Sequence, residues 1–388
     1  MNTFDITFLS ELLTACCVVF GGVQLWLAFW VYDRVPRTAN RQAAAEERPD
    51  SELPPLSVIL VTKDSAQALQ TNLPRILEQD YPSFEVIVIN DQSSGADGDV
   101  LKRLSASYPH LYYSFIPTTA RYVSRKKLGV AMGIRASRHE WLVFTDPHCC
   151  PHSDRWLRSL AQHFTAGTDI VLGYSGFEGK AGYFGYKVRI QNFFTSLRYL
   201  GWAAAGHPYM GIGRNLAYRK STYERHKGFT DHLPLQQGDD DLLVNAMANG
   251  LNTRIAVSPD SWVRLPLPPY KRLWVEERVG RKVTGRYYQG GVGYWNAVDT
   301  GSSVLFGLCT LAGLAISIWQ QLWICTAVIA AVWVIRFVCA MTVWRRASKA
   351  LGERLCCAFP LFEWLRPWWS LQTQLQYVFR HKQDFLRK

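Results

Sequence analysis

Three apolar runs constrain this chain more than any other feature, because a helix that spans a membrane needs about 20 mainly apolar residues. The runs are Ile6–Tyr32, Val304–Trp319 and Trp323–Val343. The first is long enough to cross a bilayer by itself, and only a few residues separate the other two. We therefore expect an N-terminal transmembrane helix in residues 1–33 and a transmembrane hairpin in residues 300–344.

Basic residues follow the first run and the third run. They are Arg34, Arg37 and Arg41 after the first, and Arg345, Arg346, Lys349 and Arg354 after the third. Because positive residues gather on the cytoplasmic side of membrane helices, both flanks and the segment between them are expected in the cytoplasm. The chain is thus predicted to be a multi-pass protein of the cell membrane. Residues 345–388 would hold a basic loop, interfacial or re-entrant helices interrupted by Pro360 and Pro367, and a basic tail.

The formal net charge of +12 is compatible with nucleic acid, anionic lipid or a polyanionic substrate as a partner. The sequence has no zinc-finger spacing, basic zipper or RNA-binding aromatic signature, so no nucleic-acid partner is expected. Many basic residues adjoin apolar runs, which favours the membrane. The nine cysteines include no CxxC pair, and most lie in or beside apolar runs. We interpret those as small hydrophobic side chains rather than as disulfides.

The segment between the membrane runs has a different pattern. Residues 34–55 are polar and rich in Ala, Glu and Arg, which is typical of a linker. In residues 56–299, short strand-like runs alternate with helix-like segments. Strands are expected at Leu56–Thr62, Phe84–Asn90, Leu111–Ile116 and Trp141–Thr145, and helices at Ala66–Glu78 and Arg125–Ser137. This alternation indicates an α/β domain with a mostly parallel, Rossmann-like sheet covered on both faces.

Two carboxylates follow predicted strands, at the sheet edge where ligands gather in open α/β folds. Asp91 lies in Asn90-Asp91-Gln92-Ser93-Ser94, where it can accept hydrogen bonds from a base or a ribose. The same five residues also suit an ordinary polar turn. Asp146 lies in Asp146-Pro147-His148, after the fourth strand.

The pair Asp146 and His148 combines a carboxylate with an imidazole, two residues apart. This donor set suits a divalent cation such as Mn²⁺, whereas Mg²⁺ prefers oxygen ligands only. A zinc site is the alternative, formed by His148, Cys149, Cys150 and His152. The crowding of these four residues does not match the usual spacing of structural zinc sites.

Two further charged clusters occur later in the chain. In Asp239-Asp240-Asp241 the repulsion between adjacent carboxylates can raise one pKa toward the range of a general base. Acids are also favourable at a helix N-terminus. A basic cluster follows, formed by Arg278, Arg281, Lys282 and Arg286. It suits either a diphosphate group or the anionic surface of a membrane.

Taken in this order, the motifs resemble the family 2 glycosyltransferases, specifically the membrane-anchored branch related to ceramide glucosyltransferase, hyaluronan synthase and cellulose synthase. The similar region runs from Leu56 to about Tyr288 and is followed by the hairpin expected of that branch. The resemblance implies a GT-A catalytic domain, a nucleotide-sugar donor (a UDP-sugar favoured) and a divalent cation, Mn²⁺ or Mg²⁺. The acceptor would be a lipid or a glycan, and the aromatic-rich residues 183–209 favour a lipid.

The resemblance also implies roles for single residues. Thr62 and Lys63 stand in the family's first turn, and Asp91 in the place of its nucleotide-binding Asp. Lys127, in a segment similar to Gly-Lys-x-x-Ala, and Asp146 would contact the donor as well. Asp146 and His148 would bind the cation, Asp240 would be the catalytic base, and Arg281 would stabilise the leaving diphosphate. Residues 211–219 resemble the segment on the acceptor side.

Three residues depart from the family pattern. Ser65 replaces an acid of the first turn, His148 replaces the second Asp of the metal motif, and Lys282 stands where the family has Trp. In the processive synthases that Trp seats the acceptor sugar, so its absence argues against a polymerase.

The implied reaction is an inverting displacement, in which Asp240 takes the proton of an acceptor hydroxyl. Two alternatives remain at this stage. One is a polyprenyl-phosphate sugar synthase, whose anionic acceptor needs no base. The other is a catalytically silent membrane subunit that binds a nucleotide sugar. A nucleotidyltransferase is disfavoured, because no Gly-rich triphosphate loop follows the first strand.

Overall fold

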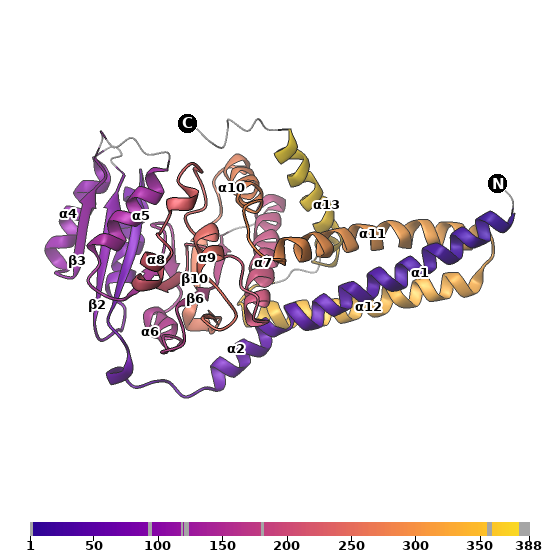
Figure 1. The fold of residues 1–388 in the computed structure, drawn as a ribbon, viewed down its shortest axis with the longest axis horizontal. Helices are drawn as coiled ribbons and strands as arrows, with labels where there is room; N and C mark the ends of the chain where they lie inside the picture. Colours follow the sequence, from indigo (N-terminus) through magenta and orange to yellow (C-terminus); the bar gives the residue numbers. More distant parts are fainter. Residues whose placement is uncertain are drawn as a thin grey trace.

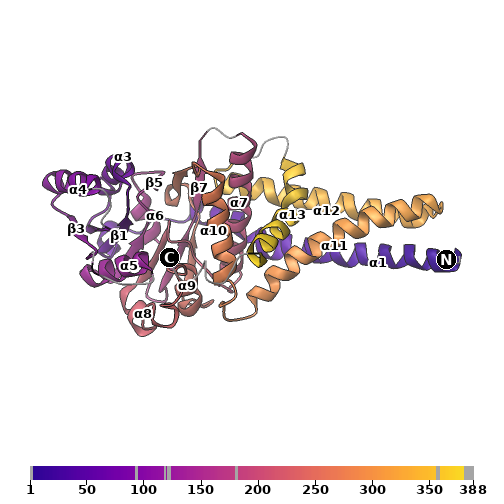
Figure 2. The same ribbon diagram turned by 90° about the horizontal axis from the view of Figure 1, so that it is seen from above.

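An α/β domain and a rod of three long helices make up the chain (Figure 1). The computed structural model describes residues 3–91, 95–117, 119, 124–179, 182–354 and 359–379. The rod is formed by α1 (Thr3–Leu27), α11 (Val292–Trp319) and α12 (Trp323–Ala350). These helices lie side by side in both views and project away from the domain (Figures 1 and 2).

The centre of the domain is a sheet of seven strands, in the order β3-β2-β1-β4-β8-β6-β9. The strands are β1 (Leu56–Thr62), β2 (Phe84–Asn90), β3 (Leu111–Phe115), β4 (Trp141–Phe144), β6 (Ile170–Gly173), β8 (Leu216–Arg219) and β9 (Thr253–Ala256). Strand β1 runs parallel to β2 and β4, with Thr62 opposite Asn90, and only β8 runs antiparallel to its neighbours. The predicted α/β fold with a mostly parallel sheet is confirmed.

Helices cover both faces of this sheet, which therefore buries nearly continuous apolar strands. Alternate residues of β1 point to the two faces: Ile59 belongs to one hydrophobic core, and Val58 and Leu60 belong to the other. The covering helices are α3 (Ala66–Leu77), α4 (Ala96–Ser107), α5 (Arg125–Ala136), α6 (Trp156–Ala161), α7 (Tyr183–Ala204), α8 (Lys220–Arg225) and α9 (Asp241–Met247).

A second, smaller sheet and two more helices extend the domain toward the rod. The sheet has the order β5-β10-β7, with β5 (Cys150–Pro151), β7 (Ser175–Glu178) and β10 (Val263–Pro266). The helices are α10 (Lys271–Thr284) and α13 (Phe359–Val378), which contact each other near the base of the rod (Figure 2). Short 3-10 turns lie at Asp50–Glu52, Thr230–His232 and Pro259–Ser261.

Three helices are long and apolar enough to cross a membrane, among the residues that the structure describes. They are Ile6–Ala44, Gly293–Trp319 and Trp323–Ala350. They match the three predicted runs but are longer. The hairpin helix α11 begins at Val292, twelve residues before the apolar run itself.

The linker predicted for residues 34–55 differs most from the structure. A π-helical turn at Ala28–Tyr32 leads into α2 (Arg34–Ala44), so the first half of the linker is helical. Pro36 lies in the first turn of α2, where a missing backbone N–H costs little. Val35 and Ala39 are buried, so tertiary packing stabilises this polar helix. Pro367 likewise lies inside α13 without ending it.

Buried carboxylates join the rod to the domain. Asp299 of α11 accepts hydrogen bonds from Tyr32 (2.7 Å) and from Arg198 of α7 (2.5 Å), and Arg366 of α13 lies 3.4 Å away. Because a buried charge is costly without partners, this cluster fixes four separate segments against one another.

Candidate active site

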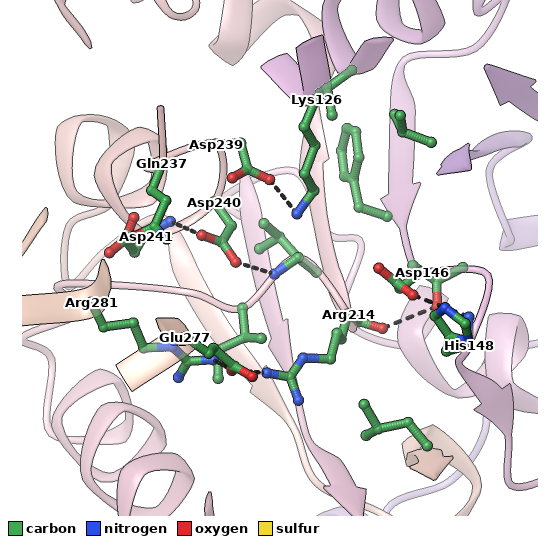
Figure 3. A pocket seen from close by; sticks show the side chains of 18 of the residues that line it. Lys126, Asp146, His148, Arg214, Gln237, Asp239, Asp240, Asp241, Glu277 and Arg281 are labelled. Carbon is green, nitrogen blue, oxygen red and sulfur yellow. Dashed lines mark hydrogen bonds and ion pairs between the residues drawn. The ribbon is translucent and has the colours of Figure 1, made fainter. Parts of the chain in front are cut away.

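A cavity of about 510 Å³ opens at the carboxyl ends of β1 and β4. This is the edge at which open α/β sheets bind ligands. The polar side chains that line the cavity are Lys126, Thr145, Asp146, His148, Arg214, Gln237, Asp239, Asp240, Asp241, Glu277, Arg281 and Thr284. Figure 3 shows the acidic run on one side and Asp146 with His148 on the other.

Asp240 is held in the cavity by two backbone groups. Its carboxylate accepts hydrogen bonds from the N–H of Asp241 (2.7 Å), as the N-cap of α9, and from the N–H of Gly213 (2.8 Å). In the structure Asp240 therefore has both of the roles considered for the acidic run: it caps a helix and faces the cavity.

The other two carboxylates of the run have different partners. Asp239 pairs with Lys126 at 2.6 Å. Burial raises the pKa of Asp239, but the Lys126 ammonium lowers it by more, so the pKa lies below its usual value. Asp241 is buried and accepts hydrogen bonds from Thr284 and Tyr288. Burial and the neighbouring Asp240 charge raise the pKa of Asp241 to about 6. The carboxyl with the raised pKa is therefore that of Asp241, the residue that follows Asp240.

Asp146 and His148 leave β4 and reach the opposite side of the cavity. Asp146 accepts a hydrogen bond from the backbone N–H of His148 (3.0 Å), and the exposed His148 ring lies 3.5 Å from the Ser65 hydroxyl. Within the described part of the chain, no group of three or more His, Cys, Asp and Glu residues is arranged to hold a metal ion. The chain can thus offer a cation one carboxylate and one imidazole. This set fits Mn²⁺ if other ligands complete the coordination.

The alternative zinc site is not formed. Cys149 is fully buried in a hydrophobic core, and burial raises the pKa of its thiol to about 12. A thiol that keeps its proton is a poor metal ligand.

The predicted nucleotide contacts lie at the ends of β1 and β2. Asp91 pairs with Arg125 and with Lys63, whose ammonium is 3.6 Å away. The Thr62 hydroxyl is buried and donates to Asp97 (2.9 Å), which also accepts from the N–H of Ser65. Asp91 and Lys63 are thus brought together, whereas the Thr62 side chain is occupied by a structural bond. Gln92, Ser93 and Ser94 lie outside the described residues.

The position of Lys127 does not support the prediction that this residue contacts the donor. Lys127 is 1% exposed, and its ammonium donates to the carbonyls of His232 (2.6 Å) and Leu235 (2.9 Å). Lys127 therefore anchors the loop before the acidic run. Its neighbour Lys126 lines the cavity instead (Figure 3). Helical rotation at the start of α5 separates the two side chains, which the sequence motif could not show.

Arg281 does line the cavity, together with Glu277 and Arg214. The sequence analysis gave Glu277 no role and placed Arg214 only within the acceptor-side segment, residues 211–219. Glu277 accepts hydrogen bonds from Arg281 (2.5 Å), one turn along α10, and from Arg214. Burial raises the pKa of Glu277, but the two guanidinium groups lower it further, so this carboxylate stays ionised. Arg214 directly follows Gly211-Ile212-Gly213, and these two glycines were the signal in the sequence that could have indicated it. The other residues of the predicted basic cluster, Arg278, Lys282 and Arg286, line a second cavity.

Comparisons with known proteins agree with this geometry. Residues 57–226 match the family model described as glycosyl transferase family 2. A glycosyltransferase named AglE, from Haloferax volcanii, is 29% identical over 127 residues, which cover 32% of this chain and 40% of that protein. The match thus spans less than half of the length of that relative.

A solved structure shares the fold over nearly the whole chain. It is the mannosyltransferase PcManGT from Pyrobaculum calidifontis, determined in complex with GDP-Man and Mn²⁺. The TM-score is 0.56 at 16% sequence identity, and the likeness covers 95% of this chain and 99% of the other. The resemblance seen in the sequence is confirmed: residues 57–226 carry a family 2 glycosyltransferase domain of GT-A fold, in a chain with three candidate membrane-spanning helices.

Proposed function

We propose that the protein transfers a sugar, with inversion, from a nucleotide-sugar donor to a lipid or glycan acceptor at the cytoplasmic face of a membrane. The observation that carries this proposal is the cavity in which Asp240 faces Asp146 and His148. In a displacement reaction, a base on one side would act on the acceptor, and a metal-binding pair on the other side would act on the leaving diphosphate.

Asp240 would take the proton of an acceptor hydroxyl while that oxygen forms a bond to the anomeric carbon. The bond from this carbon to the diphosphate breaks, and its electron pair leaves with the nucleoside diphosphate. Two backbone N–H groups hold the Asp240 carboxylate in place, so little reorganisation is needed. Proton transfer of this kind contributes about 10²–10⁴-fold to a rate.

The leaving diphosphate would lie between Asp146 and the basic side chains of the cavity. A divalent cation held by Asp146 and His148 would neutralise part of the charge that develops on it. Arg281 and Arg214 lie on the other side and would share this task. Lys126 takes the place that the sequence analysis gave to Lys127.

Asp91 and Lys63 would bind the nucleoside, at the strand ends next to the cavity. The sequence resemblance favours UDP, whereas the structural neighbour was determined with GDP-Man. Both donor classes therefore belong in the first assay. The cytoplasmic orientation is supported by the arginines after the first candidate span and by the basic residues after the third.

The proposal is tested with the purified full-length protein and radiolabelled UDP- and GDP-sugars. Release of the nucleoside diphosphate should require Mn²⁺ and stop in excess EDTA. His148→Asp creates an all-oxygen pair, so the activity with Mg²⁺ relative to Mn²⁺ should rise in this variant. Full activity in EDTA would overturn the metal assignment. Binding of a nucleotide sugar without any turnover would instead identify a silent subunit.

A further inference from the structure

A second cavity, of about 620 Å³, lies beside the first, between α7, α10, α11 and α13. Glu277 and Arg281 line both cavities, so the two spaces meet at these side chains. The mechanism proposed above does not use the second cavity. Its lining differs from that of the first in charge, because basic side chains outnumber acidic ones there.

Basic side chains crowd one side of the second cavity. Arg278 and Lys282 are four residues apart on α10 and therefore face the same way, and Arg198 and Arg286 join them. Glu277 is the one acidic residue among the described residues that line this space, and Arg214 and Arg281 already share it.

In the described part of the chain, neither Arg278 nor Lys282 forms an ion pair with a carboxylate, and the nearby Glu277 is already shared by Arg214 and Arg281. The surrounding protein and the nearby cations lower the pKa of Lys282 to about 8 and that of Arg278 to about 10. Like charges one helical turn apart destabilise a helix, so the arrangement is costly unless an anion binds there.

The other side of the second cavity is apolar and lies on the rod. It includes Val304 and Leu305 of α11 and Leu371 of α13, and the last two are each 43% exposed. A Cβ atom added to Gly293 or Gly301 would meet no heavy atom within 4 Å, so this face of α11 is open. Because the candidate span begins at Gly293, the cavity extends from the α/β domain onto a candidate membrane helix.

We propose that the second cavity binds the phosphate of a lipid acceptor, with Arg278 and Lys282 as its ligands. The apolar chain of this lipid lies along α11 and α13, and a hydroxyl on its head group reaches Asp240 past Arg281. The positive charge of Arg278 and Lys282 favours binding of a phosphate. The adjoining apolar face of α11 and α13 favours a phosphate that is attached to a lipid chain. This inference rests on the transferase activity proposed above, and it names the class of acceptor.

The test uses the full-length protein in phosphatidylcholine nanodiscs, with radiolabelled hexadecyl phosphate and hexadecanol as matched probes. The phosphate should bind at least tenfold more tightly than the alcohol. Lys282→Gln and Arg278→Gln should each remove most of this difference, because each deletes one charge-assisted contact. Arg272→Gln is the matched control: this arginine lies on the same helix, is 79% exposed and pairs with Glu276. It should leave the difference unchanged.

Three results would overturn the inference. They are equal binding of the two probes, an equal loss in Arg272→Gln and Lys282→Gln, and full displacement of hexadecyl phosphate by phosphatidylglycerol at comparable concentration. The last result would identify a site for bilayer head groups rather than for an acceptor. Cleavage of the nucleotide sugar is measured in the same nanodiscs. Its absence in the wild type would refute the proposed function, whereas normal cleavage with unselective probe binding would refute the acceptor class alone.

Discussion

The three adjacent carboxylates at the N-terminus of α9 lie in three different environments. Asp239 has the Lys126 ammonium, Asp240 has two backbone N–H groups, and Asp241 has the hydroxyls of Thr284 and Tyr288. Asp240 is half-buried and faces the cavity, whereas Asp241 is buried and Asp239 is paired with Lys126. These differences, rather than the acidity of the motif, support the proposal that Asp240 is the base.

The raised pKa of Asp241 predicts a pH-dependent contribution to stability. Its pKa is about 6 in the folded chain against an ordinary value of 3.8, so the folded state binds the extra proton between these pH values. The contribution of Asp241 to stability is therefore fully present below about pH 4 and is lost as the pH rises through 6, by at most about 3 kcal/mol.

Asp241→Asn cannot ionise and should escape this loss. Thermal unfolding in detergent should show the melting temperature of the variant rising relative to wild type between pH 4 and pH 7. A constant difference across this range would show that Asp241 does not titrate as inferred.

At the level of single residues, the sequence was most informative where a carboxylate follows a strand. Asp91 and Asp146 both lie at the sheet edge, because that edge is fixed by the topology. The sequence could not distinguish Lys126 from Lys127, since their positions depend on how α5 is rotated against the sheet. Glu277 was also missed, because its role depends on contact with Arg214, which is 63 residues away in the sequence.

Among the helices, α5 has the most constrained packing. Gly129 and Gly133 lie one turn apart and face β1, where added Cβ atoms would come within 2.8 Å of Val61 and 2.5 Å of Ile59. The two glycines therefore let α5 approach the sheet closely. This approach brings Lys126, at the start of the helix, to Asp239.

Gly133→Ala should destabilise the domain, because the new methyl group collides with the Ile59 side chain and overpacking costs about 1–3 kcal/mol. The matched control is Gly98→Ala in α4, where the added Cβ meets Phe115 at an ordinary 3.7 Å. There the better helix propensity of alanine should raise the melting temperature slightly. Equal shifts in the two variants would contradict the packing argument.

The first four strands of the α/β domain could be predicted because each is a short, mainly apolar run. The second sheet could not, since β5 has two residues and pairs only through contacts made elsewhere in the fold. Helix α2 could not be predicted from the sequence for a related reason. Its composition is polar, and the buried residues Val35 and Ala39 stabilise it only once the rod and the domain have met.

For the whole molecule, the arrangement of the rod predicts the side of the membrane on which each end lies. Single cysteines at Ala44 and Lys349, both exposed, should resist a membrane-impermeant thiol reagent in intact cells and react after permeabilisation. A cysteine at Gln320, in the turn between α11 and α12, should react in intact cells. The nine native cysteines are replaced first. If Ala44→Cys were labelled in intact cells, the cavity would lie outside the membrane, on the side without the cytoplasmic donor, and this result would contradict the account.

The central claim is that Asp240 is the base of a sugar transfer, and one measurement tests it most directly. Wild type and Asp240→Asn are compared for transfer of labelled sugar to membrane lipids and for donor binding, both with Mn²⁺. Asparagine keeps the shape of the side chain but accepts no proton, so kcat should fall about 10²–10⁴-fold while the Kd for the donor changes little. Transfer by the variant at near wild-type kcat would contradict the account, because the acceptor would then need no base at this position.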